Sequence, residues 1–265
     1  MARVVLVVPC YNEAARLPVE ELASFVLPDD ELRMLFVDDG STDETREVLE
    51  RLVARAPGRL AMLALERNGG KSEAVRRGVL HALDGEVHGE ADWVGYWDAD
   101  LATPLEELER FCAVLREEPD KDVVFGARVR LLGRHIDRKL YRHLYGRAFV
   151  TAVSTMLALP IYDSQCGAKL FRVGPDLRAA FDSPFISRWI FDVEVLARLI
   201  GRYGARGDDL AQHLVEVPLR RWSDVAGSKI TSFDAARAAG ELARIGLEYR
   251  ASLRERRRSR RQRQR

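Results

Sequence analysis

The clearest structural signal in this chain is Trp93-Val94-Gly95-Tyr96-Trp97-Asp98-Ala99-Asp100. Its first five residues are apolar and predict a buried strand, and two carboxylates follow at the C-terminal end. Open α/β sheets bind ligands at this edge, and residues i and i+2 of an extended chain point to the same side. Two adjacent like charges favour a cation between them, and Mg²⁺ or Mn²⁺ prefers oxygen ligands. The stretch therefore predicts that Asp98 and Asp100 hold a divalent cation that clamps a diphosphate, with simple cap or loop acids as the alternative.

Short apolar runs alternate with helical patterns through the first half of the chain. The helical patterns place apolar residues three or four positions apart. The predicted strands are Val4–Val8, Met34–Val37, Leu60–Leu65, Trp93–Trp97 and Val123–Gly126, and the predicted helices are Val19–Val26, Asp43–Ala56, Ser72–Leu83 and Pro104–Glu117. This alternation predicts an α/β fold with a Rossmann-like, mostly parallel sheet flanked by helices on both faces. We expect Ser41 and Glu44 to form a capping box and Thr103 to cap the helix that begins at Pro104.

Length and composition suit one large domain. The chain has 265 residues, of which 47% are hydrophobic, and it contains no Gly/Ser-rich linker. Its net charge of +1 hides a split, because residues 250–265 hold nine Arg and one Glu. This block predicts a disordered, Arg-rich tail whose target is anionic lipid or nucleic acid, or which is merely solvated.

Cysteine usage and hydropathy bear on location. The three cysteines, Cys10, Cys112 and Cys166, form no C-x-x-C pair, which favours a reducing cytoplasm over a disulfide framework. The N-terminus is too short in its apolar part for a signal peptide. The longest apolar stretch, Ala148–Ile161, has 14 residues and suits a core or interfacial helix better than a membrane span.

The second half differs in character from the first. Residues 128–147 contain seven Lys or Arg and one acid, Asp137. Beyond the apolar stretch, we predict helices over Arg188–Tyr203 and Ser232–Tyr249 and a strand over Leu214–Leu219.

Acidic segments also follow the first two predicted strands. Pro9-Cys10-Tyr11-Asn12-Glu13 offers a ring that can stack on a base and an acid that can accept hydrogen bonds from a nucleoside, with an ordinary loop as the alternative. Asp38-Asp39-Gly40-Ser41-Thr42-Asp43 places acids where dinucleotide folds bind ribose. No G-x-G-x-x-G or Walker A sequence is present, which disfavours NAD and P-loop chemistry.

A glycine turn follows the third predicted strand. Asn68-Gly69-Gly70-Lys71-Ser72 resembles a phosphate nest with free amides, a helix N-terminus and a lysine, and a helix start without ligand is the alternative. The acidic segments that follow the first, second and fourth predicted strands therefore converge on one edge of the sheet.

With these segments the chain resembles the family 2 inverting glycosyltransferases of the GT-A fold. The resemblance covers about residues 3–232. The matching segments are Val8–Glu13, Val37–Asp43, Asn68-x-Gly70-Lys71, Asp98-Ala99-Asp100, Asp163–Phe171, Arg188–Leu196, Val217-Pro218-Leu219-x-x-Trp222 and Gly227-Ser228-Lys229-Ile230. The later segments are similar to dolichyl-phosphate glucose synthases and, more distantly, to polyprenyl-phosphate mannose synthases.

The resemblance implies roles for individual residues. It implies a nucleotide-sugar half over residues 1–127 and an acceptor half over 128–249. The residues implied to bind the nucleoside are Pro9, Tyr11, Glu13 and Asp39. Asp98 and Asp100 are implied at the metal and diphosphate, Arg128 at phosphate, and Lys229 at the donor diphosphate or the acceptor phosphate. Further expected substrate contacts are Lys71, Gln165, Trp189 and Ser228. Mannose synthases of this group carry a glutamine where this chain has Ala102, which leaves the third metal ligand undefined.

The function implied is inverting transfer of a hexose from a nucleotide sugar, UDP-glucose by resemblance, to polyprenyl phosphate at the cytoplasmic membrane face. A metal and cationic side chains would stabilise the leaving diphosphate. Arg134, Arg138, Arg142 and Arg147 could meet the lipid phosphate and anionic headgroups, with the Arg tail as a second contact; a solvated helix face is the alternative for this basic stretch. The alternative is a soluble enzyme that uses GDP-mannose or another nucleotide sugar and a hydroxyl acceptor.

A hydroxyl acceptor would need a general base. Asp192 and Glu194 are the candidates, and ion pairs with Arg188 or Arg198 four residues away are the alternative. A sugar nucleotidyltransferase is disfavoured because no Gly-rich loop follows the first strand. Nucleic-acid binding is disfavoured because the rest of the chain is acidic and lacks interleaved aromatic and basic residues.

Overall fold

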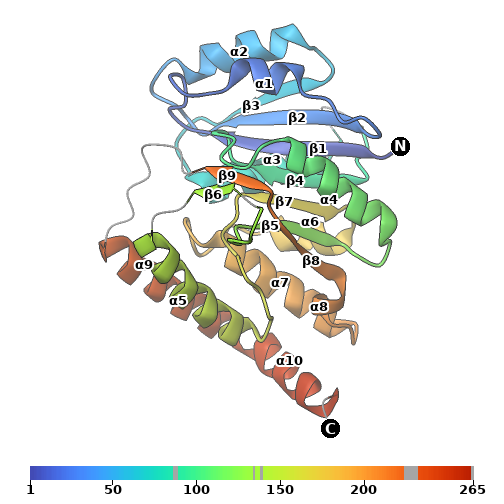
Figure 1. Ribbon diagram of the computed structural model, residues 1–265, viewed down its shortest axis with the longest axis vertical. Coiled ribbons are helices and arrows are strands. Elements are labelled where there is room, and N and C mark those ends of the chain that lie inside the picture. Colours follow the sequence, from blue (N-terminus) through green and yellow to red (C-terminus); the bar gives the residue numbers. More distant parts are fainter. Residues whose placement is uncertain (86–88, 134, 138–139, 224–231, 264–265) are drawn as a thin grey trace.

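The computed structural model describes residues 1–85, 89–133, 135–137, 140–223 and 232–263 (Figure 1). Its centre is a seven-stranded sheet with the order β3-β2-β1-β4-β7-β5-β8. The strands are β1 (Arg3–Cys10), β2 (Glu31–Asp38), β3 (Leu60–Ala64), β4 (Trp93–Trp97), β5 (Val123–Ala127), β7 (Ala168–Arg172) and β8 (Leu214–Pro218). Only β7 among these runs antiparallel to its neighbours. The prediction of a mostly parallel, Rossmann-like sheet is confirmed.

Alternating side chains of the strands build one hydrophobic layer on each face of the sheet. From β1, Val4 and Leu6 pack on one side, and Val5 and Val7 pack on the other. The first face is covered by α1 (Val19–Ser24), α2 (Thr45–Arg55) and α4 (Glu106–Glu117). The second is covered by α3 (Lys71–Leu83), α6 (Pro175–Phe181) and α7 (Phe191–Ala205). Helices α5 (Leu140–Leu157), α9 (Ser232–Glu248) and α10 (Arg250–Arg263) pack against α7 (Figure 1). Both faces are therefore sealed, as a parallel sheet requires.

Two smaller features complete the fold. Strands β6 (His135–Asp137) and β9 (Arg221–Ser223) pair in parallel as a separate ribbon. The short helix α8 (Leu210–His213) leads directly into β8. Among the helices that the structure describes, none is long and apolar enough to cross a membrane.

Both predicted helix caps are wrong. Helix α2 begins at Thr45, whose amide donates to Asp43 Oδ1 at 3.0 Å, while Ser41 Oγ accepts from the Asn12 amide at 3.1 Å. Helix α4 begins at Glu106, and the Thr103 carbonyl accepts from Trp97 Nε1 at 2.7 Å. At α2 the Ser41 hydroxyl is used in a contact with the segment after β1, and at α4 the helix begins later than predicted, with Leu105 before its first residue.

The Arg-rich segment also differs from its prediction of disorder, because residues Arg250–Arg263 form α10. Leu253 is buried, and Arg256 is buried against Asp209. Arg257 donates to the carbonyls of Thr155 and Met156 at the C-terminal end of α5. These bonds satisfy carbonyls that a helix end leaves free, so packing orders a sequence whose composition suggested a solvated chain.

Candidate active site

The carboxyl ends of β1, β2 and β4 meet the start of α3 around a cavity of about 270 Å³. Seven of the predicted residues line this cavity, which we call the acidic pocket. They are Pro9, Tyr11, Glu13, Asp39, Lys71, Asp98 and Asp100, joined by Cys10, Arg16, Ala74 and Ala99. Convergence follows from the parallel register of the three strands, which carries their carboxyl ends to one edge.

The two acids that follow β4 have different surroundings. Asp98 Oδ1 forms an ion pair with Lys71 Nζ, and both side chains are partly exposed. Asp100 Oδ1 accepts a hydrogen bond from the Ala102 amide at 3.1 Å. Burial, reinforced by the charge of Asp98, raises the pKa of Asp100 above its ordinary value of 3.8. Burial and the neighbouring charge of Asp98 therefore both disfavour the ionised form of Asp100.

A divalent cation suits this donor set. Both carboxylates supply hard oxygen atoms to one cavity. Burial raises the pKa of Asp100, and the charge of Asp98 adds to that effect; a cation between the two carboxylates would relieve the repulsion. Among the described residues, no group of three or more His, Cys, Asp or Glu side chains could ligate a metal. The remaining positions of a cation would fall to water and substrate phosphates, which is how Mg²⁺ is commonly held.

Gly167 is a site residue that the sequence analysis missed. Its carbonyl accepts from the Asp98 amide at 3.1 Å, and a Cβ placed on it would overlap the Asp98 carboxylate. Its φ lies outside the left-handed region, so the requirement for glycine arises from space alone. Only the overlap with a residue distant in sequence reveals this role.

Asp39 changes the interpretation of the glycine turn. Its two carboxylate oxygens accept from the amides of Gly69 and Gly70, each at 2.8 Å. Burial nevertheless raises the pKa of Asp39. The phosphate-nest hypothesis is wrong for these two amides, because a carboxylate from the end of β2 already occupies them.

The segment after β1 is tied to the segment after β2. Glu13 accepts two hydrogen bonds from Arg16, one of them from Nη2 to Oε1 at 2.6 Å, and its amide donates to Thr45 Oγ1 at 2.7 Å. Tyr11 keeps 42% of its surface exposed at the rim, where its ring can stack on a base. Arg16 was not predicted; its position three residues after Glu13 was the available signal.

The two candidate bases lie in buried ion pairs. Asp192 Oδ1 accepts from Lys169 Nζ and from the Tyr96 hydroxyl, each at 2.6 Å. Glu194 Oε1 pairs with Arg198 Nη2 at 2.7 Å, as the four-residue spacing suggested. Asp192 pairs with Lys169 instead of Arg188. The signal that sequence reasoning overlooked is a lysine inside an apolar strand, since a buried cation needs a partner.

Beyond β5, Arg128 is also engaged. Its Nε and Nη2 donate to Asp163 at 2.6 and 2.8 Å, and its guanidinium lies 5.3 Å from the Trp222 ring centroid. Gln165 lies in the same segment as Asp163, and Trp189 is 37% exposed. Arg134, Arg138, Ser228 and Lys229 lie outside the described residues, as does the side chain of Arg142 within α5.

The family described as glycosyl transferase family 2 matches residues 5–177, which is more than half of the chain. This chain belongs to glycosyl transferase family 2. The acidic pocket lies within the matched span, so this family 2 glycosyltransferase carries the pocket in the part that defines its family.

Individual relatives and one solved structure extend the comparison. The chain is 29% identical over 262 residues to the dolichyl-phosphate beta-glucosyltransferase of Dictyostelium discoideum, covering 92% of this chain and 74% of the relative. It is 31% identical over 242 residues to that of Homo sapiens, covering 86% and 69%. Glucosyl-3-phosphoglycerate synthase from Mycobacterium tuberculosis, in complex with Mn²⁺ and UDP-glucose, superposes with a TM-score of 0.60 at 16% identity, covering 94% and 79%. This last likeness shows the shared fold.

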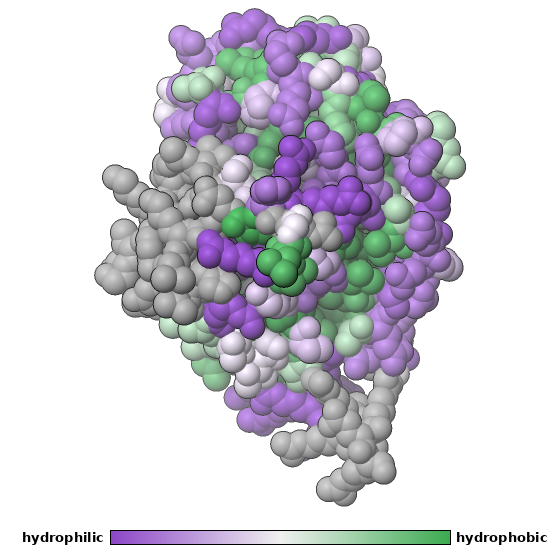
Figure 2. All heavy atoms as spheres, in the orientation of Figure 1, coloured by the Kyte–Doolittle hydropathy of each residue, from purple (hydrophilic) through white to green (hydrophobic). Residues whose placement is uncertain are grey.

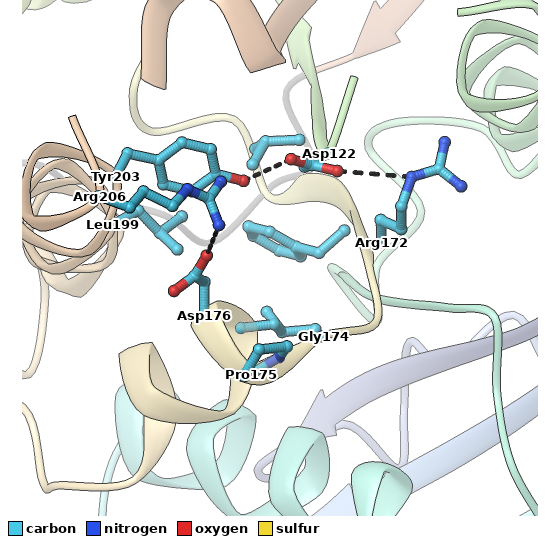
Figure 3. Close-up of a pocket in the computed structure, with 11 residues that line it drawn as sticks. Asp122, Arg172, Gly174, Pro175, Asp176, Leu199, Tyr203 and Arg206 are labelled. Carbon is cyan, nitrogen blue, oxygen red and sulfur yellow. Dashed lines mark hydrogen bonds and ion pairs between the residues drawn. The ribbon is translucent and has the colours of Figure 1, made fainter. Parts of the chain in front are cut away.

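A separate cavity of about 150 Å³ lies at the start of β5, at the opposite edge of the sheet (Figure 3). Its charged groups satisfy one another. The Tyr203 hydroxyl donates to Asp122 at 2.5 Å, Arg172 Nε lies 3.5 Å from the same carboxylate, and Arg206 pairs with Asp176. We interpret this cavity as structural, because its polar groups already have partners and it lies at the edge away from the acidic strand ends.

Proposed function

We propose that this glycosyltransferase moves glucose from UDP-glucose to the phosphate of a polyprenyl or dolichyl phosphate, with inversion at the anomeric carbon. The observation that carries the proposal is the acidic pocket, in which Asp98 and Asp100 stand beside Lys71 at the carboxyl edge of the sheet. The identity of the donor and acceptor is supported by the relatives, whose printed name is dolichyl-phosphate beta-glucosyltransferase.

In this proposal, residues at the ends of the strands bind different parts of the nucleotide sugar. Tyr11 stacks on the base, and Glu13 and Asp39 accept hydrogen bonds from the nucleoside. The ammonium of Lys71 pairs with Asp98 in the structure. When the donor binds, we expect this ammonium to move from Asp98 to the diphosphate. A divalent cation bound by Asp98 and Asp100 would supply charge stabilisation to the leaving diphosphate.

The buried acids support a phosphate acceptor. A phosphate oxygen is largely ionised near pH 7 and needs no proton removed before it attacks, whereas a hydroxyl needs a general base within hydrogen-bond reach. Asp192 is held by Lys169 and Tyr96, and Glu194 by Arg198. These buried ion pairs disfavour both carboxylates as the base that a hydroxyl acceptor would require.

We also place the enzyme peripherally on the anionic cytoplasmic membrane face. Arg250, Arg254, Arg257 and Arg258 are exposed along α10. The coloured atoms at the lower end of the molecule in Figure 2 include a hydrophilic patch. Each basic side chain near an anionic leaflet contributes about 1 kcal/mol. Sedimentation with phosphatidylserine vesicles, and release from them by salt, tests this placement.

The test of the reaction is transfer of radiolabel from UDP-glucose. The enzyme is incubated with Mn²⁺ and either polyprenyl phosphate or a panel of hydroxyl acceptors, with GDP-mannose as the competing donor. We expect label in the lipid phosphate, none from GDP-mannose, and loss of transfer in excess chelator that Mn²⁺ restores. Transfer only to a hydroxyl compound would overturn the acceptor, and full activity in chelator would overturn the cation.

A further inference from the structure

A small third cavity lies between α5 and the segment that precedes β7. Its volume is about 50 Å³, and its polar lining comes from Arg128, Arg147, Tyr162, Asp163, Ser164 and Gln165. It shares no lining residue with the acidic pocket. We call it the α5 pocket.

Three buried polar atoms of the α5 pocket have no hydrogen-bond partner among the described residues. They are Arg147 Nη1, Ser164 Oγ and Gln165 Nε2, and Ser164 is only 1% exposed. Buried polar atoms in folded proteins are nearly always bonded, so three such atoms around one cavity call for an explanation. A guanidinium and an amide nitrogen can only donate, and a hydroxyl can donate. The missing partner is therefore a hydrogen-bond acceptor.

The charges around the pocket indicate that this acceptor is anionic. The guanidinium of Arg128 is met by the Asp163 carboxylate. The guanidinium carbon of Arg147 lies 4.2 Å from the centroid of the Tyr162 ring. No carboxylate of the described residues forms an ion pair with Arg147. The pocket thus presents a cation that no carboxylate of the described residues pairs with, and an anion would compensate its charge.

The donors are held in place before any ligand arrives. Glu216 on β8 accepts from the amides of Tyr162 and Asp163 at 2.7 and 2.8 Å, and the Gln165 amide donates to Asp163 at 3.2 Å. The cavity volume is several times the roughly 10–15 Å³ that one water needs. It therefore has room for a compact group of several atoms.

We propose that the α5 pocket binds a phosphoryl group through Arg147, Ser164 and Gln165. A phosphoryl group offers several acceptor oxygens and negative charge, which matches three donors and one free cation. Where that group is the phosphate of the lipid acceptor, the assignment rests on the proposed function. Its position fits that role, since the segment continues through Cys166 to Gly167, which touches the Asp98 carboxylate.

The test measures binding without any nucleotide sugar. Inorganic phosphate and a short isoprenyl phosphate are each titrated calorimetrically into the full-length protein and its variants. We expect both probes to bind, Arg147→Gln to weaken them about 10- to 100-fold, and Ser164→Ala to weaken them about 3- to 10-fold. The matched control is Arg244→Gln, which removes a charge from an exposed position of α9 and leaves both affinities unchanged.

A second readout separates ligand binding from a purely structural role. Without phosphate, Ser164→Ala removes an unbonded buried hydroxyl and is expected to keep or raise the melting temperature; a clear drop would show that Ser164 is a structural hydroxyl. The Ser164→Ala variant also allows the binding test to be made if Arg147→Gln does not fold.

The outcomes distinguish the sources of the phosphoryl group. Binding of inorganic phosphate but not isoprenyl phosphate would support the pocket and overturn its link to the lipid acceptor. If neither probe binds, or if all variants bind both probes equally, the proposed phosphoryl site is overturned and water is left as the occupant of the α5 pocket. If both probes bind as expected but the radiolabel assay shows no transfer, the proposed function fails while the phosphoryl site stands.

Discussion

The contact between Gly167 and Asp98 yields the sharpest prediction. A Cβ at residue 167 would lie closer than 2.5 Å to all three terminal atoms of Asp98, whereas ordinary contact begins near 3.4 Å. Since the clashing atoms end a rotatable side chain and the φ of residue 167 is not in the left-handed region, Gly167→Ala is expected to fold and to displace the carboxylate. The required displacement is about 1 Å or more.

That displacement sets the expected magnitude. Misplacing a catalytic group by about 1 Å costs about 100-fold in rate, or about 2.7 kcal/mol of transition-state stabilisation. The loss of stability should be small, because the Asp98–Lys71 pair that moves is partly exposed and contributes at most about 1 kcal/mol. For a chain of this size that corresponds to a melting temperature lowered by no more than about 4 °C.

The assay combines sugar transfer, Mn²⁺ titration and thermal unfolding. Gly167→Ala should transfer label about 100-fold more slowly and need more Mn²⁺ for half-maximal activity. Gly174→Ala is the matched control, because a Cβ there meets nothing within 4 Å. Wild-type rate and Mn²⁺ dependence in Gly167→Ala would refute the reasoning that the position of Asp98 controls the reaction.

Three further predictions concern buried charge. Asp100→Asn should abolish metal-dependent transfer. Because the pKa of Asp100 is raised in the folded state, its ionised form lowers the stability of the protein at pH 7. The variant should therefore unfold at a higher denaturant concentration than the wild type at pH 7, but not below pH 3.8. Lys169→Met should lower the free energy of unfolding by about 3–5 kcal/mol by leaving Asp192 unpaired, and a loss under about 1 kcal/mol in a denaturant titration would contradict a coupled buried pair. Arg256→Ala should loosen α10 by removing its bond to Asp209, seen as faster tryptic cleavage after residue 250; equal cleavage of the wild type would show that α10 is not anchored there.

Much of the first half of the fold follows from local pattern. The predicted strand Trp93–Trp97 matches β4 at both ends, and the other predicted strands of that half differ from the observed ones by only a few residues. Strand β7 was not predicted, because Lys169 interrupts its apolar pattern. That lysine is buried only because the fold supplies Asp192 as its partner.

The candidate site divides in the same way. Tyr11, Asp39 and Asp98 could be found because their side chains directly follow strands, and parallel strands bring their ends together. Gly167 could not be found, since its importance lies in the space that Asp98 fills. Arg128 is expected from the resemblance to contact phosphate, and its pairing with Asp163 could not be read from the sequence because the two residues lie 35 positions apart.

The sequence by itself determined where strands form and which strand ends carry acids, because alternation and strand termination are local properties of the chain. The tertiary structure alone decided which charge meets which. Lys71 meets Asp98 across 27 residues, Lys169 meets Asp192 across 23, and Arg128 meets Asp163 across 35. The strength of such pairs depends on burial and geometry that only packing creates. Among the described residues, the same packing leaves one polar atom each of Arg147, Ser164 and Gln165 without a hydrogen-bond partner around a single cavity.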